Sequence, residues 1–402
     1  MSSSEPTLNS LAASICEAAK SITAYLEENG HSAPSFGEGG LENYPRDPKA
    51  TSDLHHLALG PAEFSFLQPF FWNHDAMTLD ILNQFNYFGA VPIGGFATYR
   101  DIADKTTLPE SLVRRVLRHA MTMRLFEEKP PGAGKVPQSI QKFSAGKDKA
   151  SEEIMQSGFS ISDFDHIGRP SSLWEFLDRT PEGKPEEYQV KRYSEAMEVV
   201  AANSVFKTEE ILATFDWQSL GEATVVDVGG SAGHDAVILA KKYPALKLVV
   251  QDLPQNEAKF QGSLPPDLVS RISFQAHDFF TPQPLEADVY FLKMILHDWP
   301  NKDAISIVRN LTHNLKPGGR ILLCENLVPP AFDEQGNPLL PLTARRMHSV
   351  LDLQMLTQFN SLERSEKEWD TLIKEADERC EIRAVYTVPG ALQSILEVIV
   401  KE

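Results

Sequence analysis

Cysteine is scarce in this sequence, and so are the features of secreted and membrane proteins. The only cysteines, Cys16, Cys324 and Cys380, are isolated from one another. Without a Cys-x-x-Cys pair, their spacing indicates neither a disulfide framework nor a zinc site built on thiolates. The N-terminus lacks the basic start and apolar centre of a signal peptide, and no window approaches the ~18 apolar residues of a membrane helix. We therefore expect a soluble protein in the reducing cytoplasm.

Positively charged residues are also few: the sequence has 38 Lys and Arg against 56 Asp and Glu, which gives a formal net charge of −18. Nucleic acids and anionic membranes are bound by cationic surfaces, so neither is an expected partner of this chain. A neutral or cationic ligand fits this negative net charge better than an anionic one. With 402 residues, of which 42% are apolar, the chain is long enough for two domains with packed cores.

From about residue 200 onward, short runs rich in β-branched residues alternate with helical stretches. The runs lie at 224–228, 247–251, 272–274, 288–292 and 320–326, and the helical stretches at 234–243, 303–315 and 345–359. Alternation at this spacing is typical of a parallel sheet covered by helices on both faces. The pattern of residues 380–401 predicts two further strands at an antiparallel edge of the sheet. The sequence thus predicts an α/β domain over residues 201–402.

Residues 1–200 are expected to form a mainly helical domain. Within it, residues 94–130 predict a short helix, a turn and a second helix opened by Pro109, a pattern that resembles a winged helix and that we assign to about 60–130. The second helix has one apolar face, made of Leu112, Val113, Val116, Leu117, Ala120 and Met121. The outer face of this helix carries arginines, which are typical either of a helix that reads DNA or of a face exposed to solvent. They are Arg114, Arg115, Arg118 and Arg124. No other basic cluster in this acidic chain supports DNA binding.

A predicted strand, a glycine turn and an amphipathic helix follow one another in the segment VVDVGGSAGHDAVILAKKY. Gly229, Gly230 and Gly233 allow a tight turn and the approach of a ligand to the N–H groups at the helix start. Their spacing differs from Gly-x-Gly-x-x-Gly, so a dinucleotide site fits poorly. The same segment matches a Gly-x-Ser-x-Gly nucleophile elbow around Ser231, with His297 as its base, but no upstream strand is available for the second oxyanion donor.

Acidic residues accompany the first three strands of this domain. Asp227 lies in the first strand, Asp252 ends the second, and Asp278 follows the third. Ligands of open α/β sheets bind at the carboxyl ends of the strands, so these carboxylates are expected to converge there. An acid after the second strand is placed to accept ribose hydroxyls, and the loop has no Lys or Arg for a phosphate. A cationic nucleoside such as S-adenosylmethionine, a sulfonium, therefore suits the site better than a pyrophosphate.

Four segments are recognisable together in their order and spacing: VVDVGGSAGHDAVILAKKYPALKLVVQDLP, AHDFF, FLKMILHDWPNKDA and LKPGGRILLCEN. They resemble the plant and fungal small-molecule O-methyltransferases of the caffeic-acid type, and the resemblance covers residues 85–400. It implies a Rossmann-like domain with a mostly parallel seven-stranded sheet that binds S-adenosylmethionine. It also implies a preceding winged-helix region used for homodimerisation rather than for DNA. The implied acceptor is a phenolic or enolic hydroxyl of an aromatic or polyketide-like secondary metabolite, without a metal ion.

The resemblance assigns roles position by position. The cofactor loop falls on Gly229, Gly230 and Gly233, next to the strand acid Asp227. Asp252 falls on the ribose ligand, and the adenine neighbours fall on Leu253, Asp278 and Phe279. Lys293 falls at the rim of the cofactor. In the helix 345–359, the expected acceptor contacts are Asp352, Met355 and Phe359.

His297 falls on the catalytic base of the family, and the two acids that flank this base fall on Glu325 and Glu363. A phenol, with a pKa near ~10, is mostly protonated at neutral pH, and a histidine, near ~6.5, can accept that proton. A carboxylate on the far ring nitrogen would fix the tautomer, and Glu325 is our candidate for this role. Asp298 is expected to cap the helix that opens beyond Pro300.

The segment around Glu363 departs from the family pattern, since Ser361 and Leu362 stand where glycines are usual. Glu363 is therefore either a flanking acid or a solvated residue before a helix that Ser365 and Glu368 open as a capping box.

Residues 143–190 match the family only loosely and include His166 and Arg169. Because of this segment, the alternative remains open that the protein is an enzyme that retains the cofactor but catalyses dehydration or pericyclic rearrangement. A DNA-binding regulator is the remaining alternative. Retention of His297, Asp298 and Glu325 together favours methyl transfer.

Overall fold

The computed structural model describes residues 8–28, 71–92, 95–128, 135–136, 180, 183–186, 188–191, 208–330, 339–340 and 342–401. The chain divides into two compact units. The first consists of Met1–Ile167 with Ala331–Leu353, and the second of Gly168–Pro330 with Gln354–Glu402. The C-terminal half of the sequence therefore contributes residues 331–353 to the first unit. His166 and Arg169 lie outside the described residues.

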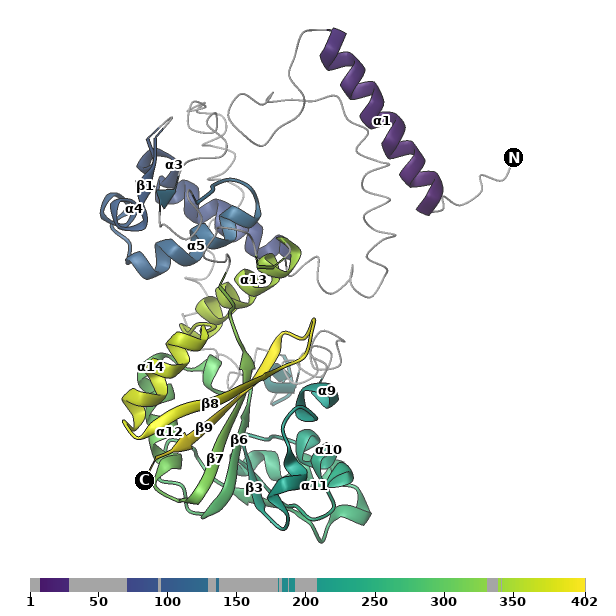
Figure 1. Ribbon diagram of the computed structural model, residues 1–402, viewed down its shortest axis with the longest axis vertical. Coiled ribbons are helices and arrows are strands. Elements are labelled where there is room, and N and C mark those ends of the chain that lie inside the picture. Colours follow the sequence, from purple (N-terminus) through teal and green to yellow (C-terminus); the bar gives the residue numbers. More distant parts are fainter. Residues whose placement is uncertain are drawn as a thin grey trace. The chain divides into compact units, whose positions relative to one another are not determined.

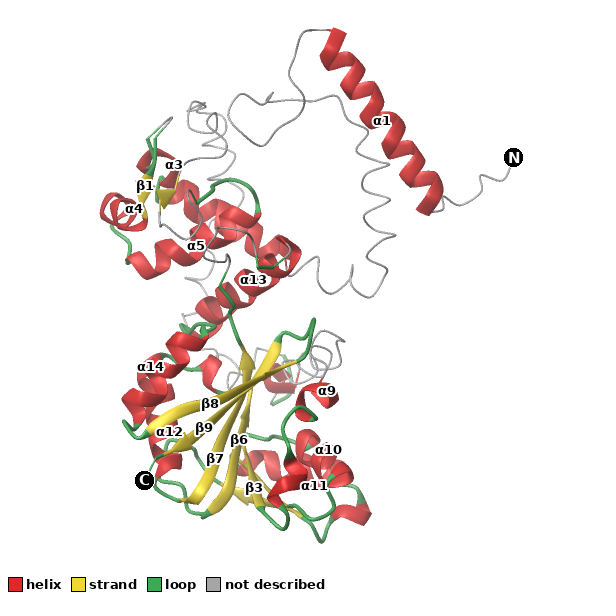
Figure 2. Cartoon of the chain, in the orientation of Figure 1, coloured by secondary structure: helices red, strands yellow, loops and turns green. Residues whose placement is uncertain are grey.

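The second unit is built around a seven-stranded sheet in the order β5-β4-β3-β6-β7-β9-β8 (Figures 1 and 2). Its strands are β3 (Thr224–Val228), β4 (Lys247–Asp252), β5 (Ile272–Ala276), β6 (Ala287–Lys293), β7 (Leu315–Asn326), β8 (Cys380–Thr387) and β9 (Gln393–Val400). Strands β3 to β7 run parallel to one another, whereas β9 is antiparallel to both β7 and β8. The prediction of a mostly parallel seven-stranded sheet is confirmed.

Helices cover both faces of this sheet. One face is covered by α9 (Thr208–Leu212), α10 (His234–Lys242) and α11 (Glu257–Ser263). The opposite face is covered by α12 (Asn301–Thr312) and α14 (Glu366–Ala376). Successive residues of a strand point to opposite faces, so the near-continuous apolar runs of the sequence bury side chains on both sides. The carboxyl ends of β3 to β7 remain as the edge at which ligands of such sheets bind, and we call it the carboxyl edge.

The first unit is mainly helical within the described residues. Its elements are α1 (Leu8–Glu28), a helix at 71–84, α3 (Tyr87–Ala90), β1 (Ala97–Thr98), α4 (Tyr99–Thr106), α5 (Glu110–Thr122), β2 (Lys135–Val136) and the first residues of α13 (Leu342–Phe359). The predicted helix, turn and second helix correspond to α4 and α5, and Pro109 is the N-cap residue of α5. The apolar face expected on α5 packs into one core. No helix that the structure describes is both long and apolar enough to cross a membrane.

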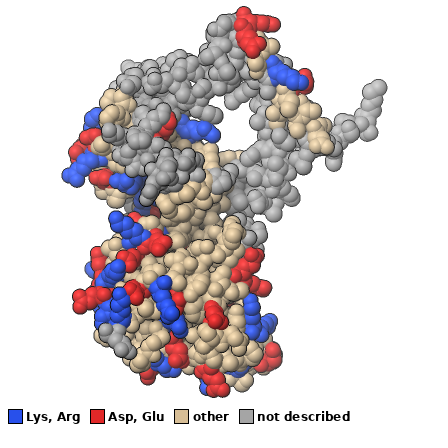
Figure 3. Space-filling view, viewed as in Figure 1, with Lys and Arg blue, Asp and Glu red and all other residues tan. Residues whose placement is uncertain are grey.

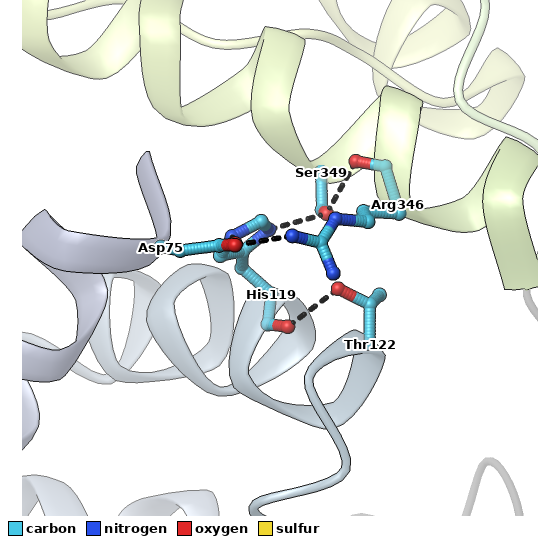
Figure 4. Close-up of polar contacts among 5 residues, drawn as sticks. All are labelled: Asp75, His119, Thr122, Arg346 and Ser349. Carbon is cyan, nitrogen blue, oxygen red and sulfur yellow. Dashed lines mark hydrogen bonds and ion pairs between the residues drawn. The ribbon is translucent and has the colours of Figure 1, made fainter. Parts of the chain in front are cut away.

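A buried cluster of polar side chains, the polar seam, joins α13 to α5 within this unit (Figure 4). His119 of α5 is fully buried; its Nδ1 lies 2.9 Å from Ser349 Oγ and its Nε2 lies 3.0 Å from Asp75 Oδ1. Arg346 pairs with the same Asp75 carboxylate. A serine, a histidine and an aspartate also make up a hydrolytic triad, but the Ser349 hydroxyl is buried and donates to the Arg346 carbonyl of its own helix. We therefore interpret the polar seam as structural.

The arginines of α5 are partly neutralised inside the first unit. Arg115 Nε lies 2.9 Å from Asp352 Oδ2, and Arg115 Nη2 donates to the Asp352 carbonyl at 2.6 Å. Arg114 pairs with Glu110 at 3.0 Å and lies over the Tyr99 ring. Two of the four arginines that could have formed a DNA-reading surface, Arg114 and Arg115, are thus paired with groups inside the first unit.

Candidate active site

The glycine loop between β3 and α10 is shaped by left-handed backbone and by close packing. Gly229 and Gly233 have φ angles of 76° and 75°, which favour glycine. A Cβ on Gly229 would lie 2.6 Å from Ile295 Cδ1, and one on Gly233 would lie 3.0 Å from the Phe260 ring. Because Gly233 directly precedes α10, the loop brings the first N–H groups of that helix to the carboxyl edge.

Gly230 is required for a different reason, a buried acid directly behind it. A Cβ on Gly230 would lie 2.5 Å from Asp227 Oδ2 and 2.9 Å from Val250 Cγ1. Asp227 is 3% exposed, and its Oδ2 has no hydrogen-bond partner in the described part of the chain. Burial and the neighbouring Asp235 raise the pKa of Asp227 well above its ordinary value. A cationic ligand group at this position relieves the cost of burying the charge.

Asp252 at the end of β4 holds the glycine loop in place. Its Oδ2 accepts the Ser231 N–H at 2.8 Å, and its Oδ1 accepts hydrogen bonds from Leu253 N and Asn256 Nδ2 at 2.7 Å. A carboxylate offers about four acceptor positions, so one remains for a ligand hydroxyl. Among the described residues, the imidazole of His297 is bonded to acids and not to Ser231. The nucleophile-elbow hypothesis therefore loses its support.

An aromatic cluster lies at the same edge, with two of its members after β5 and the third after β6. Phe279, Phe280 and Trp299 form it, with ring centroids 4.7 Å to 5.9 Å apart. Asp278 is exposed just before it and accepts the Phe280 N–H at 2.9 Å. Leu253, after the neighbouring strand β4, is 42% exposed. Exposed apolar side chains of this kind suit a planar ring system.

Lys293 at the end of β6 is tied to α10. Its Nζ lies 2.9 Å from Asp235 Oδ1 and 3.4 Å from Thr208 Oγ1. Buried Asp227 interacts electrostatically with Lys293, Asp235 and Asp252. Asp227 thus has two acids and one cation as charged neighbours, a balance that favours a cationic ligand.

His297 lies in the short 3-10 turn η5 (Leu296–Asp298), directly after β6. The residue is 5% exposed; its Nδ1 lies 3.1 Å from Glu363 Oε1, and its Nε2 lies 3.4 Å from Asp298 Oδ1. The helix α12 does begin beyond Pro300, but Pro300 itself is its N-cap residue and no side chain caps it. The prediction that Asp298 caps this helix is therefore wrong, and Asp298 faces the imidazole instead.

The two flanking acids have different roles. Glu325 Oε1 accepts the backbone N–H groups of Leu296 at 2.8 Å and Ile295 at 3.2 Å, so this carboxylate holds the turn that carries His297. The hydrogen bond to the imidazole is made by Glu363 rather than by Glu325, our candidate for that role. Glu363 is 3% exposed, which excludes its interpretation as a solvated residue.

These groups shift one another's proton affinities. Burial lowers the pKa of His297, but Asp298, Glu363 and Glu325 raise it more, and the balance raises it to about 10. Burial also raises the pKa of Asp298 to about 6 and that of Glu325 to about 7. At neutral pH the turn therefore holds an imidazolium among carboxyl groups.

Arg364 is a site residue that we did not single out from the sequence. Its guanidinium is fully buried and donates to the carbonyls of Leu296 at 2.9 Å and Trp299 at 2.7 Å and to Asn301 Oδ1 at 3.0 Å. It also lies over the Trp369 ring at 5.0 Å. Arg364 thus fixes both ends of the turn that carries His297. Its position directly after Glu363 was the available signal.

The expected acceptor contacts differ in their surroundings. Asp352 is 3% exposed and pairs with Arg115 within the first unit, so its carboxylate is already engaged. In the second unit, Met355 is 6% exposed and Phe359 is half-buried. Among the described residues, no group of three or more His, Cys, Asp or Glu is placed to hold a metal ion.

Comparison with known proteins decides the family. The family model of the O-methyltransferase domain matches residues 180–377. O-methyltransferase lcsG of Purpureocillium lilacinum is 30% identical over 92% of this chain and 88% of its own length. The chain belongs to the O-methyltransferase family. A second fungal O-methyltransferase, aoiF of Aspergillus oryzae, is 33% identical over 86% of this chain and 85% of its own length.

The fold of this O-methyltransferase also has a solved counterpart. An O-methyltransferase family 2 protein from Planctomyces limnophilus, in complex with apigenin, gives a TM-score of 0.57 at 16% identity, over 82% of this chain and 94% of that chain. The protein is thus an enzyme that transfers a methyl group from S-adenosylmethionine, and the dehydration or rearrangement alternative is not favoured.

Proposed function

We propose that this O-methyltransferase methylates a phenolic or enolic hydroxyl of a small, aromatic or polyketide-like secondary metabolite, with His297 as the general base. The observation that carries the proposal is the buried pair of His297 and Glu363 at the carboxyl edge. A carboxylate on one ring nitrogen fixes the tautomer and stabilises the imidazolium that forms when the other accepts a proton. A relative from Cladonia grayi, 30% identical over 97% of this chain and 87% of its own length, is named for a grayanic acid biosynthesis cluster.

The residues at the carboxyl edge fit S-adenosylmethionine. A cation is favoured by the buried Asp227, whose Oδ2 has no partner among the described residues, and by the acids Asp235 and Asp252 that interact with it. When bound, the cofactor supplies a methyl group already activated on a sulfonium. The residues that would hold it are Asp227 and the loop glycines Gly229, Gly230 and Gly233 at its charged part, Asp252 at the ribose, and Leu253, Asp278 and Phe279 at the adenine, with Lys293 balancing the acids.

Gly230→Ala is expected to remove measurable S-adenosylmethionine binding. The added methyl would lie 2.5 Å from the Asp227 carboxylate and 2.9 Å from Val250, and both groups are held in a packed strand, so the loop itself must move. Isothermal titration calorimetry measures the loss. Gly262→Ala in α11 is the control, since nothing lies within 4 Å of its Cβ, and it should bind normally. Normal binding by Gly230→Ala contradicts the assigned loop.

The cluster around His297 sets the strength of the base. With its pKa raised to about 10, the imidazole matches a phenol, whose pKa is near ~10. A proton therefore passes between them with little change in free energy. Since the free enzyme holds the imidazolium at neutral pH, one proton must leave before His297 can accept another. We expect kcat/KM to rise with pH toward about 10.

Glu363→Gln is expected to shift the midpoint of that pH profile to lower pH. Glu363 raises the pKa of His297 by its charge and hydrogen bond, whereas glutamine keeps an acceptor oxygen without the charge. A lower pKa leaves the imidazole neutral, and so active, at lower pH. Profiles of kcat/KM with one acceptor measure the shift. Glu366→Gln removes an exposed acid in the first turn of α14 and should leave the midpoint in place. A fixed or rising midpoint in Glu363→Gln contradicts the role of Glu363.

Further parts of the proposal concern assembly and location. We propose that the helical region up to about residue 200 contains a winged helix at about 60–130 that forms a homodimer, and that residues 201–402 form the catalytic domain. The free cysteines Cys16, Cys324 and Cys380 support a cytoplasmic location. In the second unit, Figure 3 shows acidic and basic side chains interspersed on the visible face, which gives no support to a DNA-binding regulator.

One experiment tests the function directly. The protein is incubated with S-adenosylmethionine labelled in its methyl group and with an extract of its own cells, and label is expected in a small molecule. A new product without label points to dehydration or rearrangement. Absence of both label transfer and cofactor binding contradicts the proposal.

A further inference from the structure

Asn326 is a buried amide at the carboxyl edge, outside the groups described above. It is the last residue of β7 and is 1% exposed. In the part of the chain that the structure describes, neither its Nδ2 nor its Oδ1 has a hydrogen-bond partner. Leaving a buried polar group unpaired costs about 1–3 kcal/mol, so an amide with both ends unpaired calls for a physical explanation.

A second buried amide, in the loop between β5 and β6, has all of its polar atoms paired. Gln283 is 3% exposed, and it exchanges two hydrogen bonds of 2.8 Å with Gln251. Its oxygen also accepts the Leu285 N–H at 3.1 Å. Gln283 is thus fully paired within the described residues, whereas Asn326 is not paired by any of them.

The strand order places Asn326 one strand away from the turn that carries His297. Along the carboxyl edge, Phe279 follows β5, Asp252 ends β4, the glycine loop follows β3 and His297 follows β6. Under the proposed function, the cofactor occupies the part from β5 to β3, and the acceptor hydroxyl lies at His297. The next strand is β7, ~4.8 Å further on. The residue before Asn326 is Glu325, whose carboxylate bonds the His297 turn at 2.8 Å.

Local packing does not account for the free amide. Alternation along β7 puts Asn326 on the sheet face opposite to Glu325, the face that also carries Cys324. Its partner in the antiparallel register is Gln393, whose Oε1 accepts the Cys324 thiol rather than the Asn326 amide. The Asn326 amide therefore ends its strand with one acceptor and one donor group available.

We propose that Asn326 binds a second oxygen of the acceptor, a hydroxyl or carbonyl ortho or peri to the hydroxyl that is methylated. A hydroxyl both donates to Oδ1 and accepts from Nδ2, and a carbonyl accepts from Nδ2. Asn326 is then a specificity-determining residue, because a site built to bind an oxygen rejects an analogue that lacks it. This inference rests on the proposed function, and it narrows the acceptor to ortho- or peri-oxygenated phenols.

The stability of the free enzyme gives a test that needs no acceptor. Asn326→Leu keeps the number and branching of the side-chain heavy atoms and removes two polar atoms that are unpaired among the described residues, so the melting temperature is expected to rise by about 2 °C or more. Gln283→Leu is the matched control, because it breaks a paired amide and should lower the melting temperature. If Asn326→Leu instead lowers it as Gln283→Leu does, Asn326 is a structural residue and the proposal fails.

A pair of probes tests recognition: 2,3-dihydroxynaphthalene and 2-naphthol, which differ by one neighbouring hydroxyl. The wild-type enzyme is expected to prefer the diol at least about tenfold in kcat/KM. Asn326→Leu should reduce this preference to about twofold, the statistical factor for two hydroxyls, without changing the Kd of S-adenosylmethionine. An unchanged preference overturns the inference even when methylation proceeds. Failure of the proposed function is seen separately, as loss of cofactor binding and of label transfer from the cofactor.

Discussion

His297→Ala is expected to lower kcat by about a hundred- to ten-thousand-fold, the usual contribution of a general base. The variant keeps Glu363 and Asp298 but has no group between them to accept the proton of the acceptor. The proposed cofactor residues lie on or after β3, β4 and β5, with Lys293 at the end of β6, and the imidazole pairs with Glu363 and Asp298 rather than with any of them. The Kd of S-adenosylmethionine should therefore stay within about twofold of the wild-type value. Label transfer at saturating acceptor measures kcat, and calorimetry measures the Kd.

His313→Ala is the matched control for that experiment. His313 is an exposed histidine after α12, so its removal should leave both kcat and the Kd unchanged. A His297→Ala enzyme that retains wild-type turnover contradicts the assignment of the base. A variant that loses cofactor binding together with turnover shows that His297 supports the fold of the edge rather than the chemistry.

The sheet of the catalytic domain was predictable because its signals are local. The run TVVDV corresponds residue by residue to β3, since β-branched residues between turn signals identify a buried strand. The capping box of Ser365 and Glu368 at the start of α14 is equally local and is also present. The insertion of β9 between β7 and β8 depends on pairing between distant segments. The sequence therefore indicated two terminal strands at an antiparallel edge but not their order.

Glu325 and Glu363 were identified as the acids that flank His297, but which of them bonds the imidazole was not predictable, for the same reason. Glu363 reaches the imidazole only because the chain after α13 returns to β7, where Arg364 bridges to Leu327. Nothing in the sequence near Glu325 shows that its carboxylate bonds backbone N–H groups instead. Asp352 was expected to contact the acceptor, but its carboxylate pairs with Arg115, 237 residues away in the sequence. Local patterns identify candidate residues, and long-range contacts assign their roles.

Arg364→Met is expected to lower the free energy of unfolding by about 3 kcal/mol or more. Methionine retains much of the apolar stem, but it leaves the buried carbonyls of Leu296 and Trp299 without a donor, at about 1–3 kcal/mol each. The stacking on Trp369 is lost as well. Urea denaturation measures the change. Arg379→Met is the control, since this arginine pairs with Asp377 at the surface, where its side chain is 55% exposed, and exposed pairs contribute about 0–1 kcal/mol.

The same substitution should also lower kcat at temperatures where the variant is folded. Leu296 and Trp299 bracket His297, and Arg364 joins their carbonyls through one rigid guanidinium. Without it, the imidazole loses its fixed position, and a displacement of about 1 Å can cost a hundredfold in rate. Arg364→Lys should not restore either property, because an ammonium lacks the planar fork that reaches several acceptors. Full turnover in a destabilised Arg364→Met enzyme means that Glu325, through the N–H groups of Ile295 and Leu296, is sufficient to hold the turn.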